Sequence, residues 1–315
     1  MNGSGVTAGG WSCGTVSPAV SSCETGGVVF RLAGEDDVPA IRRISLALGQ
    51  AEEDSGSDAE YVQFLLATGT VMVAETASGS SVIAWGAVKQ SRGRSMLTDL
   101  FVDPDHQARG VGAGLLRRLW PNGPQEPARF TFSSRHPAAL PIYARAGLAP
   151  SWPLLYMSGD RRSLAGPDGS AHLEVRQVDA GSAAAADMRL ASAGRADVAD
   201  VADIAGLAAD YRWWGRGRLL SGLIVLDGAR PVAAGVATRS GLAHLTCPDE
   251  RNAAPAVIAA LLALDAPEVS LCLPGPHPAV RDLLEAGFRI DDYDISMSTP
   301  DVSLASTWVY SPGLG

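Results

Sequence analysis

Cysteine is scarce and scattered in this sequence. The chain has four cysteines, and neither C-x-x-C spacing nor a nearby pair of histidines accompanies any of them. Structural zinc sites and disulfide scaffolds both need clustered or regularly spaced cysteines, so neither is expected, and no metal site is predicted. A reducing cytoplasm is the expected location. The four are Cys13, Cys23, Cys247 and Cys272.

Long hydrophobic runs and an excess of positive charge are also missing. No apolar run reaches membrane-spanning length, and the N-terminus lacks the basic start and apolar core of a signal peptide. Lysine and arginine number 25 against 34 aspartates and glutamates, a net charge of −9. Because nucleic-acid binding needs a basic face, we expect no nucleic-acid partner, and no membrane partner either. An acidic surface suits an amine substrate.

The chain is long and apolar enough to form two packed domains. It has 315 residues, of which 46% are hydrophobic. A single core rarely grows to that size, so two domains of ordinary size are expected. Strand and helix patterns alternate along the chain, which places it in the α/β (α+β) class. We expect a monomer or a homodimer.

The most informative stretch runs from Met96 to Leu119. Residues 96–102 are mostly apolar, which is typical of a strand in the middle of a sheet. A turn and a glycine-rich segment, residues 107–114, separate this strand from leucines at helical spacing. A helix start carries unpaired N–H groups and a positive dipole end, and glycines leave these groups open to a ligand. This order therefore predicts binding of a phosphorylated cofactor.

The spacing of the glycines distinguishes among phosphate-binding motifs. The dinucleotide fingerprint G-x-G-x-x-G fails, because its last position falls on Leu115 or Arg117, and no G-K-[ST] tripeptide of a P-loop follows. The pattern [QR]-x-x-G-x-[GA] does fit, with Gln107, Gly110 and Gly112 directly after the strand. These residues resemble the acyl-CoA-binding motif of the GNAT superfamily of N-acyltransferases. The alternative is a glycine-rich turn that binds no ligand.

A second segment strengthens the resemblance. It is similar to the later GNAT signature N-x-x-A-x-x-x-Y-x-x-x-G-F, with Ala139, Tyr143 and Gly147 matched. His136 replaces the asparagine of the signature and Leu148 its phenylalanine. A helix that carries the tyrosine and ends at the glycine also follows ordinary capping chemistry. Two motifs in the expected order are more specific than either motif alone.

The resemblance implies direct transfer of an acyl group from acetyl-CoA to an amine, without a covalent enzyme intermediate. It also implies that backbone N–H groups of the glycine-rich loop hold the pyrophosphate of the cofactor. Arg109 would add its N–H and its guanidinium, unless it is only a solvated cation at the helix start. The cofactor-binding residues implied are Leu100, Phe101, Val102, Gln107, Ala108, Arg109, Gly110, Val111, Gly112, Ala113, His136 and Ala139.

Two side chains are predicted to carry the chemistry. By resemblance Tyr143 is the general acid that protonates the departing thiolate; the alternative is a tyrosine that packs under the sheet. Asp99 is the candidate base, because a carboxylate inside an apolar strand is costly unless it is used or paired. The alternative is a carboxylate that only attracts the cationic substrate. N–H groups near Leu100 and Phe101 would bind the thioester oxygen if the strand bulges there. His136 is expected to cap the tyrosine helix rather than relay a proton.

The resemblance and an internal echo predict two tandem GNAT-like domains, each with a mixed central sheet flanked by helices. Residues 247–249 (CPD) echo residues 103–105 (DPD), and residues 277–279 echo 136–138 (both HPA). An internal duplication explains both echoes, and two unrelated α/β domains are the alternative. The predicted segments are a disordered tail (1–27), a catalytic domain (28–159), a linker (160–170), a degenerate domain (171–299) and a C-terminal tail (300–315).

The second copy is predicted to be chemically degenerate. Ala254, Pro255 and Ala256 are aligned with the glycine-rich loop, so methyl groups would narrow the loop and the proline would remove an N–H donor. Leu284 is aligned with Tyr143 and has no proton to donate. This copy is expected to pack against the first and to wall its substrate cleft, and a separate binding site in it is left open.

One further cluster combines aromatic and basic residues. In an acidic protein we interpret it as packing at the domain interface, the alternative being a nucleic-acid or ligand site. Its members are Tyr211, Arg212, Trp213, Trp214, Arg216 and Arg218.

These observations predict a cytoplasmic acetyltransferase whose first domain acetylates the primary amine of a small molecule. Two alternatives stay open: the acceptor is an amine of a peptide or protein, or the chain binds acyl-CoA without turnover. Only an enzyme would lose rate, with little change in binding, when Tyr143 is replaced by phenylalanine.

Overall fold

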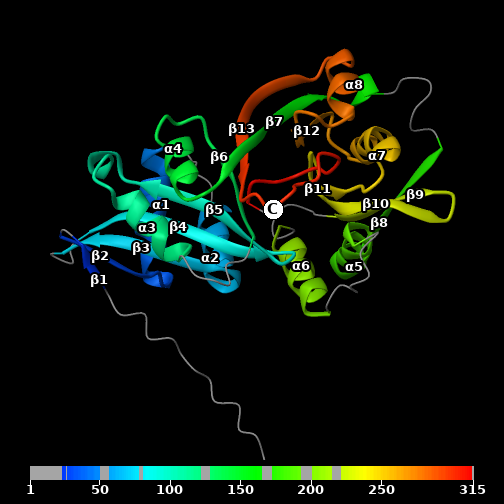
Figure 1. Cartoon of the computed structure of the whole chain (residues 1–315). Coiled ribbons are helices and arrows are strands. Elements are labelled where there is room, and N and C mark those ends of the chain that lie inside the picture. Colours follow the sequence, from blue (N-terminus) through cyan, green and yellow to red (C-terminus); the bar gives the residue numbers. More distant parts are fainter. Residues whose placement is uncertain are drawn as a thin grey trace, which may run out of the picture.

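The computed structural model describes residues 23–25, 27–49, 57–77, 81–121, 128–164, 172–192, 201–214 and 221–313 (Figure 1). All strands in these residues belong to one sheet. They are β1 (Cys23–Thr25), β2 (Val28–Leu32), β3 (Thr70–Thr76), β4 (Val82–Ser91), β5 (Arg94–Val102), β6 (Ala128–Ser133), β7 (Ala149–Asp160), β8 (Leu173–Val178), β9 (Ser221–Asp227), β10 (Arg230–Ala237), β11 (Gly241–Thr246), β12 (Glu268–Pro274) and β13 (Arg289–Ser298).

Helices cover both faces of this sheet (Figure 1). The α-helices are α1 (Val38–Ala47), α2 (Ser57–Thr68), α3 (Val111–Leu119), α4 (Ala139–Arg145), α5 (Ala180–Ala191), α6 (Val201–Trp214), α7 (Glu250–Leu262) and α8 (Ala279–Glu285). The short 3-10 helices are η1 (Glu35–Asp37), η2 (Pro104–His106) and η3 (Arg161–Leu164).

The strand order shows that the two halves exchange their last strands. Across the sheet the order is β1-β2-β3-β4-β5-β6-β13-β7-β12-β11-β10-β9-β8. Strand β13, from the end of the second half, pairs with β6 of the first, and β7 of the first half pairs with β12 of the second. The exchanged strands also pair with each other in the middle (Figure 1). Neither half therefore completes its sheet without the other.

In the first half, two apolar clusters lie on opposite faces of the sheet. Residues of α3 and α4 pack on one face with Phe30 and Leu97. Residues of α1 and α2 pack on the other face with Val73 and Trp85. The amphipathic spacing in these helices predicts such a two-faced arrangement, because each helix buries a single stripe.

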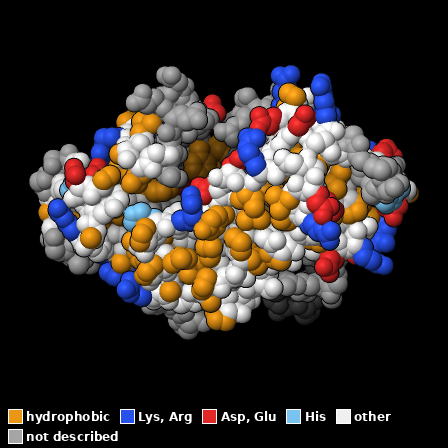
Figure 2. Space-filling view, turned by 90° about the horizontal axis from the view of Figure 1, so that it is seen from above, with side chains coloured by type: hydrophobic (Ala, Val, Ile, Leu, Met, Phe, Trp, Pro, Cys, Tyr) orange, Lys and Arg blue, Asp and Glu red, His pale blue; other side chains and the backbone are white. Residues whose placement is uncertain are grey.

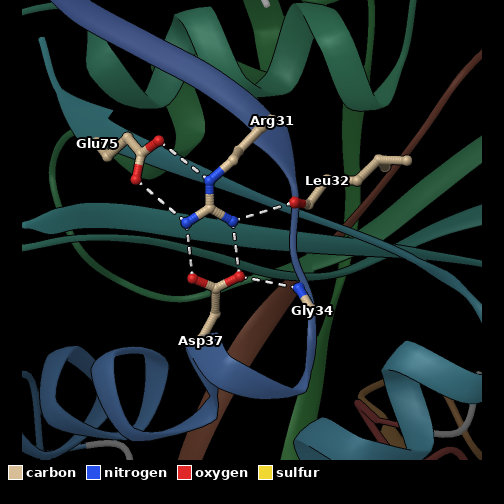
Figure 3. Close-up of polar contacts among 5 residues, drawn as sticks. All are labelled: Arg31, Leu32, Gly34, Asp37 and Glu75. Carbon is tan, nitrogen blue, oxygen red and sulfur yellow. Dashed lines mark hydrogen bonds and ion pairs between the residues drawn. The ribbon is translucent and has the colours of Figure 1, made fainter. Parts of the chain in front are cut away.

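An ion-pair network fixes the start of α1 to the sheet (Figure 3). Arg31 of β2 contacts Asp37 at 2.7 Å (Nη1 to Oδ2) and Glu75 of β3 at 3.0 Å (Nε to Oε1). Asp37 also accepts a hydrogen bond from the Gly34 N–H at 2.8 Å. The Arg31 guanidinium lowers the pKa of Asp37, so this carboxylate is ionised at neutral pH. The network holds the chain where it turns from β2 into α1.

The second half repeats the plan of the first. Residues of α7 and α8 pack on one face of its strands and residues of α5 and α6 on the other. The helices α4 and α8 have the same length and end in the same way, because Gly147 and Gly287 both follow them with a φ of 88°. A left-handed residue at this position ends a helix, and glycine adopts it without strain.

Several boundaries predicted from the sequence differ from the structure. Strand β1 lies within the predicted tail and pairs with β2, whereas residues 1–22 and 26 lie outside the described residues. The predicted linker begins with η3, and residues 165–171 are not described. Helix α6 was not predicted. No helix in the described part of the chain combines the length and hydrophobicity needed to cross a membrane.

Candidate functional site

Strands β5 and β6 open a cleft in the first half of the sheet. They are parallel neighbours, but they pair only over residues 94–97 and 128–131. Beyond these residues the strands diverge, so β5 presents backbone groups that β6 does not pair. Figure 2 shows the surface hollowed near the middle of the molecule, with hydrophobic side chains at the bottom. An extended ligand can lie in such a cleft and bond to the strand edge.

The predicted bulge in β5 is present, slightly earlier than expected. The register between β4 and β5 shifts at Thr98, which has no partner on β4. The sequence analysis allowed a bulge near Leu100 and Phe101, whereas these two residues follow it. A bulge re-aims the backbone beyond it, where successive N–H groups of the strand point alternately to its two sides. The Asp103 N–H bonds to the Ile83 carbonyl of β4, so the Phe101 N–H also points to β4 and only the Leu100 N–H points to the place where β5 and β6 separate.

The glycine-rich loop joins β5 to α3 over residues 103–110. Ala108 and Gly110 are both left-handed, with φ of 61° and 80°, and Gly110 directly precedes α3. Left-handed residues in such a turn direct successive N–H groups into a concave, anion-binding surface. The Gln107 side chain donates a hydrogen bond to the Val102 carbonyl at 3.1 Å, which closes the loop against the strand. Arg109 is exposed beside this turn.

Gly112 keeps the cleft open next to this loop. A Cβ on Gly112 would stand 3.4 Å from Cγ2 of Val102 and 3.6 Å from Cδ1 of Ile142. It would therefore fill the gap between the end of β5 and α4. Gly114 differs, because its Cβ would lie 2.6 Å from the Phe30 ring, inside the core. Gly112 thus leaves space between β5 and α4, and Gly114 allows α3 to pack closely against Phe30 of β2.

Helix α4 brings Tyr143 to the cleft. Its side chain is 7% exposed. Burial, with the charges of Asp99 and Asp294, raises the pKa of Tyr143, so its hydroxyl keeps its proton at neutral pH. At the start of α4, Nδ1 of His136 accepts a hydrogen bond from the Ala138 N–H at 3.2 Å. His136 thus stabilises the helix start, as the sequence predicted, and Ala139 follows as the first helical residue.

Asp99 lies on the side of β5 that faces α2. Its Oδ2 accepts a hydrogen bond from the Tyr61 hydroxyl at 2.8 Å. Burial raises the pKa of Asp99 to about 6, although hydrogen bonds from Thr98 and Tyr61 favour its ionised form. At neutral pH the group is ionised and close to its titration range, which suits a base or a partner for an ammonium group. The charge of Asp99 also contributes to the raised pKa of Tyr143.

Tyr61 and Trp213 complete this side of the site, and the sequence analysis named neither as a site residue. Trp213 of α6 stacks on Phe64 of α2 with ring centroids 4.2 Å apart, and lies 5.6 Å from the Tyr61 ring. Its Nε1 donates a hydrogen bond to the Glu60 carbonyl at 3.1 Å. A tyrosine on an amphipathic helix is visible in the sequence, but its partner Asp99 is 38 residues away.

Residues 55–159 match the family model of the acetyltransferase (GNAT) domain. The first half of this chain contains a GNAT acetyltransferase domain. Its match begins in the segment before α2 and ends with β7, so it includes the cleft, the glycine-rich loop, Asp99 and Tyr143.

The fold of the whole chain is that of two-domain GNAT proteins. A candidate acetyltransferase from Pyrococcus horikoshii is similar over 92% of this chain and 95% of its own, with a TM-score of 0.69 and 15% identity. A tandem GNAT protein from the clavulanic acid biosynthesis pathway is similar over 88% of this chain and 100% of its own, with a TM-score of 0.57 and 12% identity. A GCN5-related N-acetyltransferase from Kribbella flavida is similar over 86% of this chain and 71% of its own, with a TM-score of 0.53 and 17% identity. No curated protein matches the sequence.

The second half contains the same cleft, but the chain itself fills it. Strands β11 and β12 pair only at their first residues and then diverge. Between them, Val309 exchanges backbone hydrogen bonds with Leu245 of β11, and the Tyr310 N–H donates to the Cys272 carbonyl of β12 at 3.2 Å. Thr307 donates its hydroxyl hydrogen to the Cys247 carbonyl at 2.7 Å. The predicted C-terminal tail thus occupies the gap that the GNAT domain leaves open.

The loop that would hold a pyrophosphate is absent from this second cleft. Only residues 247–249 separate β11 from α7, compared with residues 103–110 in the GNAT domain. Ala254, Pro255 and Ala256 lie inside α7 rather than in a narrowed loop, which corrects the alignment made from sequence. The degeneracy predicted for this copy results from a shortened connection.

The alignment of Tyr143 also needs correction. Helices α4 and α8 share one register from Ala139 and Ala279, so the residue that matches Tyr143 is Leu283 and not Leu284. Leu283 is fully buried, whereas Leu284 is 43% exposed. The expected consequence is unchanged, because Leu283 also lacks a hydroxyl.

The position that matches Asp99 is held by His244 in a closed network. Like Asp99, His244 directly follows a bulge, here between β10 and β11. It lies 3.3 Å from the fully buried Asp187, which also contacts Arg92 at 2.9 Å and accepts a hydrogen bond from Thr246 at 2.6 Å. Burial opposes ionisation of Asp187, but Arg92 and His244 lower its pKa to about 2. This carboxylate is fully paired inside the protein.

The aromatic and basic cluster does pack between the halves. Tyr211 is fully buried and donates a hydrogen bond to Asp187, and Trp213 contacts α2. The interface interpretation is confirmed for Trp213, whereas Tyr211 packs among residues of the second half. The Trp214 side chain, Arg216 and Arg218 lie outside the described residues.

Proposed function

We propose that the GNAT domain transfers the acetyl group of acetyl-CoA to the primary amine of a small molecule in the cytoplasm. The observation that supports this proposal is that the open edge of β5, which carries Asp99, leads directly into the glycine-rich loop, and that α4, which carries Tyr143, lies beside the start of α3. A cofactor thioester placed along β5 would lie between a group that binds or deprotonates an amine and a group that donates a proton. The scarcity of cysteine supports the location.

The donor is inferred from the loop and the open strand edge. N–H groups of residues 108–113 would bind the pyrophosphate, because they lie at the positive end of α3. Gln107 and Ala139 would shape the two walls, and the edge of β5 from Leu100 to Val102 would bond to the extended pantetheine arm. The acyl group is proposed to be acetyl.

Each residue then has a definite task in the reaction. Asp99 holds the ammonium form of the acceptor and receives its proton, and the free amine attacks the thioester carbonyl carbon. The Leu100 N–H, which points to the cleft just beyond the bulge, donates to the carbonyl oxygen as it gains charge. The carbon–sulfur bond breaks as the amide forms, and Tyr143 gives its proton to the departing thiolate. The nitrogen loses its second proton in the same step, and that proton restores the Tyr143 hydroxyl. The raised pKa of Tyr143 keeps that proton available.

The test is an assay of thiol release by the full-length purified chain. Acetyl-CoA is mixed with a panel of small primary amines, and mass spectrometry identifies the acetylated product. We expect amine-dependent thiol release for at least one small amine. Release that occurs only with peptides bearing a free N-terminus would favour a peptide acceptor. Tight acetyl-CoA binding without any release would show a binding protein instead.

A further inference from the structure

Helix α6, which belongs to the second half, is held against the GNAT domain by a buried ion pair. Nζ of Lys89 in β4 lies 2.8 Å from Oδ1 of Asp210 in α6, and only 3% of the Lys89 side chain is exposed. The same Nζ lies 4.2 Å from the centroid of the Phe64 ring in α2. A buried charge that loses its partner is costly, so this pair fixes the position of α6 on α2 and β4.

The same helix places Trp213 on the face of α2 that carries Tyr61. Tyr61 and Phe64 are three residues apart on α2 and therefore share this face. The Trp213 ring stacks on Phe64 and is tilted by 49° against the Tyr61 ring, at 5.6 Å between centroids. Its Nε1 donates a hydrogen bond to the Glu60 carbonyl, so a polar contact also holds the indole. A bulky ring beside Tyr61 restricts the rotamers of its phenol.

The Tyr61 hydroxyl links this packing to Asp99. It donates a hydrogen bond to Oδ2 of Asp99 at 2.8 Å, and the carboxylate is partly exposed. A carboxylate group can rotate about its last bond, and a charged hydrogen bond from a fixed donor limits this rotation. Printed contacts thus run without a gap from α6, through Trp213 and Tyr61, to the carboxylate proposed to hold the amine.

The packing of Tyr61 does not depend on its hydroxyl. Phenylalanine would offer the same ring to Trp213 and to the apolar cluster around Trp85. We propose that Tyr61 is a positioning residue for Asp99, and that Trp213 acts on Asp99 by fixing Tyr61. The second half thereby orients the group that binds the acceptor. This inference rests on the proposed function and gives the second half a part in the reaction of the first.

The test is the dependence of kcat/KM on pH, measured as thiol release by the full-length chain with an amine that the wild type accepts. The pKa of Asp99 is about 6, so the wild-type value should fall below that pH. Tyr61→Phe keeps the ring and removes a hydrogen bond that favours the ionised carboxylate. The bend should therefore move to higher pH, by about one pH unit. The other ionisable groups that interact with the charge of Asp99 are Tyr61 and Tyr143, whose raised pKa values keep both protonated in this range.

Tyr211→Phe is the matched control. It also removes a hydroxyl that donates a hydrogen bond to a buried carboxylate, but this carboxylate is that of Asp187 in the second half. Both variants thus lose the same kind of hydrogen bond. The bend of Tyr211→Phe should stay within about 0.2 pH unit of the wild-type bend, because its hydroxyl does not bond to Asp99.

Trp213→Leu tests the link from α6. Leucine keeps an apolar side chain at this position but lacks the flat ring that restricts Tyr61, so the bend should move up by about 0.5 pH unit. In a chain that already carries Tyr61→Phe, the same substitution should add no further shift, because no hydroxyl is left to position.

The outcomes are distinct. If Tyr61→Phe keeps the wild-type bend, or if Tyr211→Phe moves it equally, the inference is wrong while the proposed function stands. The same holds if Trp213→Leu leaves the bend in place, or shifts it equally with and without the Tyr61 hydroxyl. A bend that survives in Asp99→Asn would also overturn the inference. If the wild type releases thiol with no small amine, the proposed function fails and the inference fails with it.

Discussion

The two clefts of this protein share a strand geometry and differ in what occupies them. In each half, a pair of parallel strands separates after a few residues, and a bulge precedes the separation. The GNAT domain follows its strand with a loop of exposed N–H groups, whereas the second half turns directly into α7 and receives residues 307–310. A separated pair of strands leaves backbone groups unpaired, so something must bond to them.

Asp99 and His244, which follow the two bulges, differ in how many groups they contact. Asp99 has hydroxyl partners only, Tyr61 and Thr98, and a raised pKa, whereas His244 lies in a network with Arg92 and the buried Asp187 and Thr246. A group with few partners can bind a substrate, and a group with many is committed to the fold. The comparison teaches that two halves with the same strand plan differ through the contacts that each makes locally.

The largest effect is expected for Tyr143→Phe. Loss of the proton donor should reduce kcat about 100-fold or more, while the Kd for acetyl-CoA changes less than about twofold. Steady-state kinetics and titration calorimetry measure the two values. The control is Tyr310→Phe in the second cleft, whose hydroxyl bonds only to the Ala305 carbonyl among the described residues. Equal losses of kcat in both variants would contradict the assignment of roles to the two clefts.

A substitution in the segment that fills the second cleft should lower the stability of the protein. Trp308 is 8% exposed and lies with its ring 6.2 Å from that of His244. Trp308→Ala should lower the free energy of unfolding by about 3 kcal/mol, because it empties a packed site. Denaturant unfolding measures this value, and Leu284→Ala, at an exposed position, should change it by less than about 0.5 kcal/mol. A Trp308→Ala protein of wild-type stability would show that the C-terminal segment does not hold the second cleft together.

The cofactor should bind in one cleft only. Gly112→Val would place a side chain between Val102 and Ile142, and we expect the Kd for acetyl-CoA to rise about tenfold. The control is Gly206→Val, where an added Cβ meets nothing within 4 Å. This variant should leave the Kd for acetyl-CoA unchanged. Calorimetry of the wild type should give one acetyl-CoA per chain. Two molecules of acetyl-CoA per chain would contradict the conclusion that the C-terminal segment closes the second cleft.

The smallest expected effect is the dependence of kcat/KM on pH. The pKa of Asp99 is raised to about 6, and the proposed function requires its ionised form. The kcat/KM of the wild type should therefore fall as pH drops through about 6, to about half its plateau at the pKa. Asp99→Asn should lack this bend.

Histidine ionises in the same range, so it needs a control. His244 is an unsuitable cause of the bend, because burial lowers its pKa. His136→Asn restores the asparagine of the family signature and should keep the bend. A bend that vanishes with His136→Asn and survives in Asp99→Asn would assign the titration to the histidine.

Much of the site could be predicted from sequence because it is local. The order of strand, loop and helix, the glycines at 110 and 112 and the tyrosine helix all depend on short stretches of chain. The bulge was predicted only approximately, since its position depends on the register with β4. Tyr61 and Trp213 were missed as site residues, because neither lies near Asp99 in the sequence.

The sequence by itself determined most of the strands and helices of the first half and the order of strand, glycine-rich loop and helix. These properties follow from side-chain periodicity and from allowed backbone angles, which act over a few residues. Only the tertiary structure decided the exchange of β7 and β13, the C-terminal segment that fills the second cleft and the hydrogen bond between Tyr61 and Asp99. Backbone hydrogen bonds between strands carry no residue identity, so which strand pairs with which is decided when the whole sheet assembles.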